Sequence, residues 1–186
     1  MKHTVAVLVE NHFGVLTRVA GLFSARGFNI DSLAVGETHD PEVSRMTVIA
    51  HGDDRIVDQI MKQLRKLVDV IHVEDLTGND IIERELVLIK IGANAANRND
   101  IMHVVNTFRA KIVDVSPESM TIEVTGSEGK IDAMLELLRP FDLREVVRTG
   151  QIAMGRRGDL KVPGKRVIKL AAQQAAAQKA KKTRKK

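Results

Sequence analysis

Apolar and polar positions follow two alternating patterns along the N-terminal half of the chain. Short runs of β-branched and aliphatic residues, such as Thr4–Val9, are bounded by polar or turn-forming residues and predict strands. Longer segments carry apolar residues at helical spacing, and Gly27 follows the first of them as a stop signal. The predicted order is strand, helix, strand, strand, helix, strand, over residues 4–9, 14–26, 28–38, 43–50, 53–67 and 68–73.

The same order returns in the second half, with little sequence identity to the first. Its strands and helices are predicted at residues 85–91, 99–109, 111–115, 120–125, 128–138 and 143–148. Two successive βαββαβ units predict an α+β fold of two ferredoxin-like sandwiches in series. The expected division is a first domain at residues 1–77, a linker at 78–84 and a second domain at 85–158.

Small units of this kind leave one sheet face and the sheet edges without cover. We therefore expect a homodimer or higher oligomer formed through the N-terminal domains. The alternative is a self-sufficient monomer.

Charge is distributed unevenly along the sequence. The formal net charge of +5 comes from the C-terminal end, where residues 156–186 hold 12 Lys or Arg and one acid. The remainder keeps 17 of the 29 basic and 23 of the 24 acidic residues, a net charge of −6. Residues 159–186 are predicted to form a basic, disordered tail, because their Ala, Gln and Lys composition offers no apolar face.

Composition and motifs exclude several kinds of chemistry. The absence of cysteine rules out a disulfide framework, a thiolate metal site and a cysteine nucleophile. No apolar run has the length of a membrane span, so we expect a cytoplasmic protein without a membrane partner. Phosphate-binding glycine loops, a nucleophile elbow and zinc-helix histidine spacing are all missing, which predicts no catalytic residue, no metal site and no cofactor in this chain.

One segment carries candidate binding chemistry, the connection between the first strand and the first helix. Asn11 can donate and accept through its amide, and Gly14 lets a ligand approach the backbone closely. The first N–H groups of the helix lack intrahelical partners and suit a carboxylate. Val15 and Leu16 are expected to add apolar surface, and Asn29 opens the second strand at the helix exit. Together these groups suit an amino acid with a small apolar side chain.

The same residues also have a purely structural interpretation. Asn11 can cap the helix, and Gly14 can ease a tight turn. Residue types alone favour this structural interpretation over a ligand site.

A resemblance to a known family favours the ligand site over the structural interpretation. The run Asn11-x-x-Gly14-Val15-Leu16 resembles the ligand motif of ACT domains. The longer stretch Gly21–Leu33, GLFSARGFNIDSL, resembles the small regulatory subunit of acetolactate synthase (acetohydroxyacid synthase). The resemblance continues in order over roughly residues 3–158, through segments 44–47, 63–70, 83–86, 112–115 and 147–150. The sequence departs from the family at His12-Phe13, where a small or acidic pair is usual, and in its longer basic tail.

The resemblance implies a chain without an active site of its own. Such a subunit binds a separate catalytic subunit, which holds thiamine diphosphate, magnesium and FAD and joins pyruvate to pyruvate or 2-oxobutyrate. It raises the activity of that partner and confers feedback inhibition by a branched-chain amino acid, usually valine. In the implied site two N-terminal domains pair and valine binds in the seam. Its carboxylate meets N–H groups near Gly14 and Val15, Asn11 holds its polar end, and Asn29 and Ile30 of the paired chain close the site.

Three other functions stay open at this point. The chain can be a free-standing ACT-domain sensor with another protein target, since such domains are widely reused. The basic tail supports nucleic-acid binding, although the acidic body and the lack of Trp and Tyr oppose it. An enzyme with an unrecognised site is the third. Valine, leucine and isoleucine are all candidate effectors, with valine first.

Overall fold

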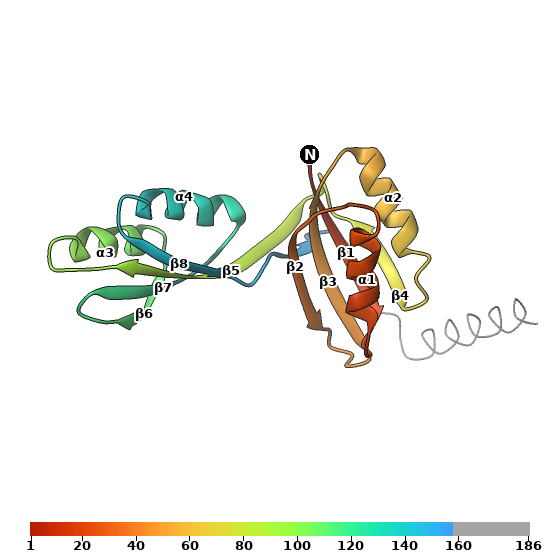
Figure 1. Ribbon diagram of the computed structural model, residues 1–186, viewed down its shortest axis with the longest axis horizontal. Helices are drawn as coiled ribbons and strands as arrows, with labels where there is room; N and C mark the ends of the chain where they lie inside the picture. Colours follow the sequence, from red (N-terminus) through yellow and green to blue (C-terminus); the bar gives the residue numbers. More distant parts are fainter. Residues whose placement is uncertain (158–186) are drawn as a thin grey trace, which may run out of the picture. The chain divides into compact units, whose positions relative to one another are not determined.

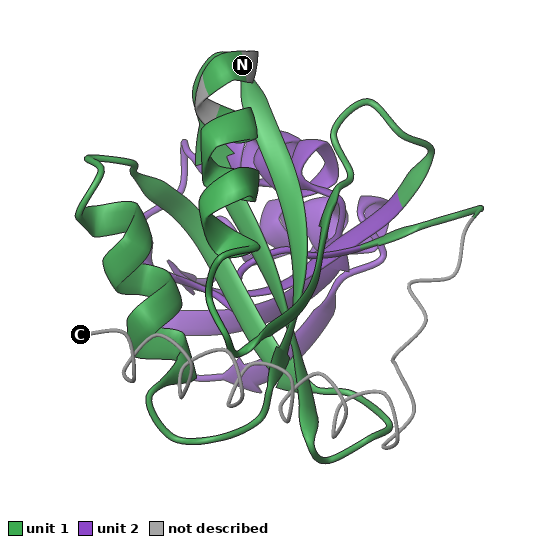
Figure 2. Ribbon diagram, turned by 90° about the vertical axis from the view of Figure 1, so that its right-hand side faces the viewer, with its two compact units in different colours: residues 1–81, 154–186 green, residues 82–153 purple. Residues whose placement is uncertain are grey.

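The structure, a computed structural model, describes residues 1–157 of the 186-residue chain, apart from the side chains of Asp54 and Ile56. The predicted basic tail therefore lies outside the described residues. The chain forms two compact units (Figure 2). One contains residues 1–81 with the described residues from 154 onward, and the other contains residues 82–153.

The first unit is a four-stranded antiparallel sheet with two helices on one face (Figure 1). The strands lie in the order β2-β3-β1-β4, which is the ferredoxin-like arrangement. The elements are β1 (Lys2–Glu10), α1 (Val15–Ser24), β2 (Ile30–Glu37), β3 (Val43–His51), α2 (Asp54–Leu64) and β4 (Val70–Asp75).

The core of this unit lies between the sheet and the helices. Strand β1 pairs with both β3 and β4, so its middle residues are buried. Alternate residues of the strand, Val5, Val7 and Val9, pack in one cluster with residues of both helices, including Phe23 and Leu64. These five side chains are at most 2% exposed, so the helical periodicity read from the sequence corresponds to real burial.

The second unit repeats this arrangement. Its sheet has the order β6-β7-β5-β8, and a short strand, β9, also pairs with β5. The elements are β5 (Ile81–Gly92), α3 (Arg98–Thr107), β6 (Lys111–Val115), β7 (Ser119–Gly126), α4 (Glu128–Leu138), β8 (Leu143–Arg148) and β9 (Ile152–Gly155). The predicted fold class, two ferredoxin-like α+β sandwiches in series, is confirmed.

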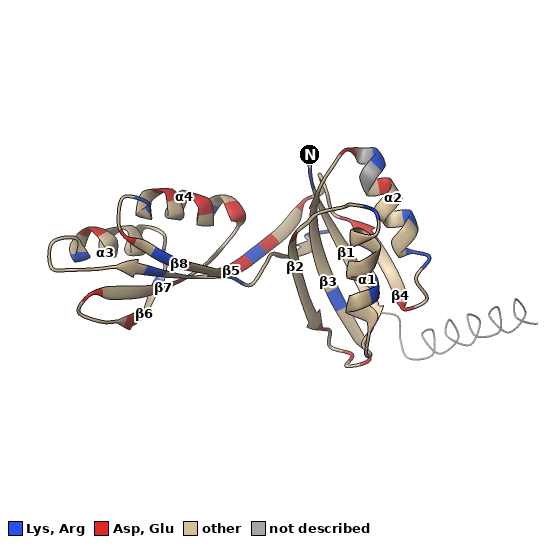
Figure 3. Cartoon of the chain, viewed as in Figure 1, with Lys and Arg blue, Asp and Glu red and all other residues tan. Residues whose placement is uncertain are grey.

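Two features at the junction differ from the sequence-based expectation. Strand β5 begins at Ile81, four residues early, inside the segment expected to be a linker. Its first half carries charged residues of both signs (Figure 3), which made it look like a loop. The missed strand β9 pairs with β5, and Arg156 bonds to Asp80 through both its backbone and its side chain, at 2.8 and 2.9 Å. Partners that are distant in sequence therefore stabilise this polar segment as a strand.

The first helix ends as its sequence predicted, although two residues earlier. Gly27 adopts a left-handed conformation with φ 69°, and the Phe28 N–H donates to the Phe23 carbonyl at 3.0 Å. Glycine takes this conformation without a steric cost, so Gly27 is confirmed as the stop signal. No helix in the described part of the chain is long and apolar enough to cross a membrane.

Two phenylalanines of the first unit provide a matched test of the core. Phe23 is 1% exposed, whereas the Phe13 side chain is fully exposed at 101%. We expect Phe23→Ala to lower the free energy of unfolding by about 3–5 kcal/mol, because it leaves a cavity. Phe13→Ala should change it by less than about 0.5 kcal/mol. Urea unfolding followed by circular dichroism measures both, and equal losses in the two variants would contradict this core.

Candidate functional site

The bend between β1 and α1 contains an unusual helix start. Gly14 occupies the N-cap position with φ 85° and ψ −7°, and no side chain caps the helix. A Cβ built on Gly14 meets no atom within 4 Å, so space beside the backbone is open. Glycine is needed here for its left-handed backbone, which confirms the expected tight turn.

Backbone N–H groups at this helix start have few partners within the described chain. The Val15 N–H donates to the His12 carbonyl at a long 3.4 Å. Within residues 1–157, the amides of Leu16 and Thr17 donate to no protein oxygen. The first turn of α1 contains no acidic side chain. The helix start thus keeps its partial positive charge, and its geometry suits a carboxylate.

Asn11 does not cap the helix but ties the bend to the turn between β2 and β3. Its side-chain Nδ2 donates to Glu37 Oε1 at 3.0 Å and to the Pro41 carbonyl at 2.9 Å. Its backbone N–H donates to the Glu42 carbonyl at 2.8 Å. The alternative that Asn11 caps α1 is therefore wrong, and Asn11 instead holds the bend in place.

The apolar residues of the bend divide between core and surface. Val15 is 3% exposed and belongs to the core, so the expectation that its side chain lines the site is wrong. It lies one helical turn before Val19 on the buried face of α1. Leu16 is 45% exposed and Phe13 is fully exposed, so these two side chains provide the apolar surface beside the helix start. Sequence reasoning did not include Phe13 in the candidate site. Its signal in the sequence was an aromatic residue that belongs to no periodic apolar pattern.

Asn29 and Ile30 lie where the first helix returns to the sheet. The Asn29 Nδ2 donates to Asp31 Oδ1 at 2.7 Å, and the other oxygen of Asp31 is 2.6 Å from His51 Nδ1. Ile30 is partly buried against the N-terminal core. Asn29 is exposed and thus available to a ligand or to another chain.

The two halves of the predicted site lie at opposite ends of one sheet. Ile30 pairs with Ala50, which in turn pairs with His3 at the start of β1. Gly14 follows the far end of β1, the end to which Asn11 ties Glu37 of β2. Residues 30 and 37 are about 24 Å apart in a strand that rises about 3.4 Å per residue. One chain therefore does not bring Asn29 and Ile30 to its own Gly14.

The equivalent bend of the second unit is constructed differently. Between β5 and α3, the Asn94 N–H donates to Asn97 Oδ1 at 2.8 Å. Asn94 Oδ1 accepts from the Ala96 and Asn97 amides at 2.9 and 3.2 Å, and Asp100 lies in the first turn of α3. Among residues 12–17 of the first bend, by contrast, the described chain offers no side-chain acceptor to any amide. No side chain of the described residues caps either helix, so the two bends differ in their loop amides, which asparagines satisfy only in the second, and in the acidic Asp100 of its first turn.

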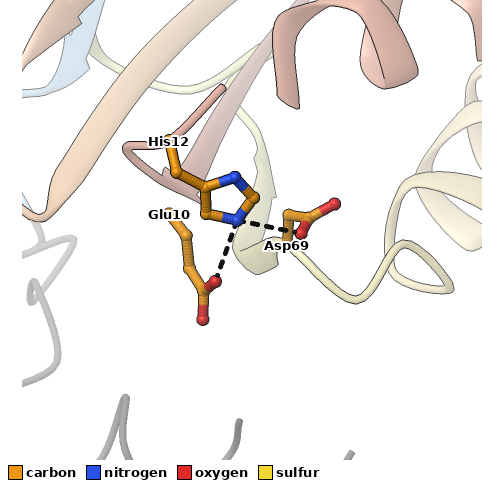
Figure 4. Close-up of side chains that lie close together, drawn as sticks. All are labelled: Glu10, His12 and Asp69. Atoms are coloured by element: carbon orange, nitrogen blue, oxygen red, sulfur yellow. Dashed lines mark ion pairs between the residues drawn. The ribbon is translucent and has the colours of Figure 1, made fainter. Parts of the chain in front are cut away.

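A second cluster lies beside the first bend and was missed by sequence reasoning (Figure 4). His12 Nε2 lies 3.2 Å from both Glu10 Oε2 and Asp69 Oδ1. Arg18 Nε lies 2.7 Å from the other oxygen of Asp69. Asp69 precedes β4 and is far from His12 in sequence, so spacing along the chain gives no sign of this cluster.

Comparison with known proteins returns one family over most of the chain. A family model described as the small subunit of acetolactate synthase matches residues 84–157, and one described as an AHAS small subunit-like ACT domain matches residues 5–72. A probable acetolactate synthase small subunit of Archaeoglobus fulgidus is 53% identical over 156 residues, covering 84% of this chain and 98% of that protein. The acetolactate synthase small subunit of Aquifex aeolicus is 48% identical over 161 residues, covering 86% of this chain and 84% of that protein.

A solved structure agrees with these sequence matches. The crystal structure of the acetolactate synthase small subunit from Thermotoga maritima superimposes with a TM-score of 0.78 at 41% identity. The match covers 86% of this chain and 99% of that one. Sequence and fold therefore point to the same relatives.

Acid titration tests the hydrogen bonds around Asn29. The hydrogen bond from His51, followed by that from Asn29, holds the pKa of the Asp31 carboxyl below its ordinary value. A carboxyl group whose pKa is lowered by folding stabilises the folded state at every pH above its ordinary pKa. That contribution is lost as the pH falls through the folded-state pKa. We expect His51→Ala to raise the Asp31 titration midpoint in carbon-detected NMR. An unchanged midpoint would show that this pair does not form in solution.

Proposed function

The chain belongs to the family of acetolactate synthase small subunits, and from this premise we propose that its N-terminal ACT domain senses a branched-chain amino acid for a separate catalytic subunit. The resemblance noted in the sequence is confirmed by the family matches. The chain is accordingly a regulatory subunit. It activates the catalytic subunit, which holds the thiamine diphosphate, magnesium and FAD, and it makes that enzyme sensitive to feedback inhibition, with valine as the effector.

The open bend before α1 is the observation that carries this proposal. Within the described chain, the N–H groups of Leu16 and Thr17 have no hydrogen-bond partner, and the space at the Cβ position of the neighbouring Gly14 is open. An α-carboxylate accepts hydrogen bonds from such groups and gains from the helix dipole. The exposed side chains of Leu16 and Phe13 give a branched aliphatic group an apolar contact. A small amino acid with a branched side chain satisfies both parts of this surface.

The complete site requires two chains. Asn29 and Ile30 lie at the opposite end of the sheet from Gly14, so a second copy must supply them. Strand β2 is an edge strand, and several of its side chains, including that of Val35, are exposed. An edge of this kind is available to pair with the same edge of another copy. Two-fold pairing then repeats the contact, so that each dimer contains two equivalent sites.

Inhibition follows if valine binds one arrangement of the complex more tightly than another. An effector that binds both arrangements equally shifts neither, so the difference in affinity is the regulatory signal. A coupling free energy of about 1–3 kcal/mol gives strong inhibition. A site in the seam between two chains suits this role, because a change in their pairing changes the site itself.

A charge placed at the bend tests the carboxylate site. Gly14→Asp adds a negative group beside the free N–H groups, and we expect the valine concentration for half-inhibition to rise about tenfold or more. Activation of the catalytic subunit should remain. The measurement is a valine titration of the synthase reconstituted from both subunits.

Two variants control for the backbone and for side-chain size. Gly78 also has a positive φ, 71°, with open space at its Cβ position, so Gly78→Asp adds the same residue under similar backbone strain away from the bend. It should keep normal inhibition. Gly14→Asn adds an uncharged group of similar size and should lose less sensitivity than Gly14→Asp. Normal valine inhibition in Gly14→Asp would reject the assigned site.

Mixing two insensitive variants tests whether two chains share the site. A chain with Gly14→Asp keeps a normal Asn29, and a chain with Asn29→Asp keeps a normal Gly14. Each variant alone should bind valine about tenfold or more weakly, whereas a refolded equal mixture should recover about one quarter of the sites with normal affinity, since half the dimers are mixed and each has one intact site. Calorimetric titration measures this fraction. A mixture that recovers no sites would exclude a site shared in this way.

A further inference from the structure

Three side chains capable of binding a metal ion converge beside the first bend (Figure 4). Glu10 ends β1, His12 lies in the bend, and Asp69 precedes β4. Their nearest nitrogen and oxygen atoms all lie within 4.8 Å of one another. The Glu10 N–H donates to the Asp69 carbonyl at 2.9 Å, so the backbone holds the two segments together independently of the side chains.

The orientation of His12 makes this cluster more than a group of neighbouring charges. Its Nδ1 lies 3.2 Å from the Phe13 carbonyl oxygen, which can only accept, so this contact is a hydrogen bond when Nδ1 carries the hydrogen. In the neutral ring, Nε2 then presents a lone pair to the two carboxylates. In that form of the ring three acceptor atoms meet at one point, an arrangement that a cation bound between them satisfies. Histidines that bind metals characteristically donate their other ring N–H to a carbonyl in this way.

The distances around His12 Nε2 are compatible with a metal ion shared by the three side chains. Charge-assisted hydrogen bonds from a protonated histidine are about 2.7–2.9 Å long. The two contacts of His12 Nε2 are both 3.2 Å. Ligand atoms bound to one tetrahedral ion at about 2.0–2.2 Å are separated by about 3.3–3.6 Å. Both contacts of His12 Nε2 lie close to the lower end of this spacing.

Arg18 fixes the carboxylate that faces His12. Its Nε lies 2.7 Å from Asp69 Oδ2, which leaves Oδ1 directed at the imidazole. Hydrogen bonds of this kind orient the ligands of metal sites. The two carboxylates and the one guanidinium carry a net charge of −1, which attracts a dication. The His12 side chain is 44% exposed, so an ion can enter from solvent and keep a water ligand.

The geometry points to a divalent transition-metal site of Glu10, His12 and Asp69, with zinc as its representative ion. One imidazole and two carboxylates suit zinc and its first-row neighbours, whereas magnesium and calcium prefer oxygen ligands alone. This site replaces the expectation of no metal, which rested on histidine spacing along the sequence.

A bound ion would also act on the proposed effector site. His12 is two residues before Gly14, so an ion anchored to Glu10 and Asp69 would hold the bend in its open form. Valine and the ion would then raise each other's affinity by the same factor. This coupling rests on the proposed function, whereas the binding of the ion does not.

Zinc titration of the purified full chain tests the site directly. After removal of metal by a chelator, we expect one zinc ion per chain by calorimetry, and cobalt should give a visible absorption band from the same site. His12→Gln and Asp69→Asn should each weaken binding about tenfold or more. His51→Gln is the matched control, since His51 pairs with a single carboxylate, and it should bind as the wild type does.

The outcomes separate the ion site from the effector site. Absent zinc binding, or equal binding by wild type and His12→Gln when circular dichroism shows both folded, would overturn the metal site. Loss of binding in His51→Gln but not in His12→Gln would place the ion elsewhere and also overturn it. Zinc binding without an effect on valine affinity would retain the site and reject the coupling. Valine binding without zinc binding would retain the proposed function alone.

Discussion

The end of strand β1 is the point on which the N-terminal unit and its proposed site both depend. Backbone hydrogen bonds hold it on both sides, from the Glu10 N–H to the Asp69 carbonyl and from the Asn11 N–H to the Glu42 carbonyl. The chain therefore leaves the sheet at a fixed position and turns into α1 through the left-handed Gly14. A helix start held in this way presents its N–H groups before any ligand arrives, so less ordering entropy opposes binding.

Local sequence signals predicted most of the fold because they act over short distances. The helical periodicity of Val15, Val19 and Phe23 and the stop at Gly27 require only neighbouring residues, and the structure contains all of them. The misjudged elements depend on distant partners. Ile81 starts a strand because β9 pairs with β5, and no local pattern shows that pairing. The direction of the Val15 side chain was also predicted wrongly. The periodicity that predicted the helix places Val15 on its buried face.

The candidate site also contains features that depend on local sequence and features that depend on distant partners. Gly14 was singled out from the sequence as a position without a Cβ, and only the resemblance to ACT domains favoured a ligand role over a tight turn. The partners of Asn11 depend on the register of β2 and β3, and the proximity of His12 to Asp69 depends on the pairing of β1 with β4. The separation of Asn29 from Gly14 also follows from register. In the proposed function, this separation is the reason that two chains must pair to complete the site.

The two units show how one fold serves two purposes. Both contain a strand, a bend and a helix in the same order. The polar groups of the two bends differ. In the second unit Asn94 and Asn97 satisfy the loop amides, and Asp100 adds a negative charge that opposes an anion. In the first unit Asn11 turns away towards Pro41 and leaves the helix start open. In the proposed function, the carboxylate ligand binds the first unit, whose helix start has no acidic residue in its first turn. The second unit is then free to serve contacts with other chains, and its role need not include an effector of this class.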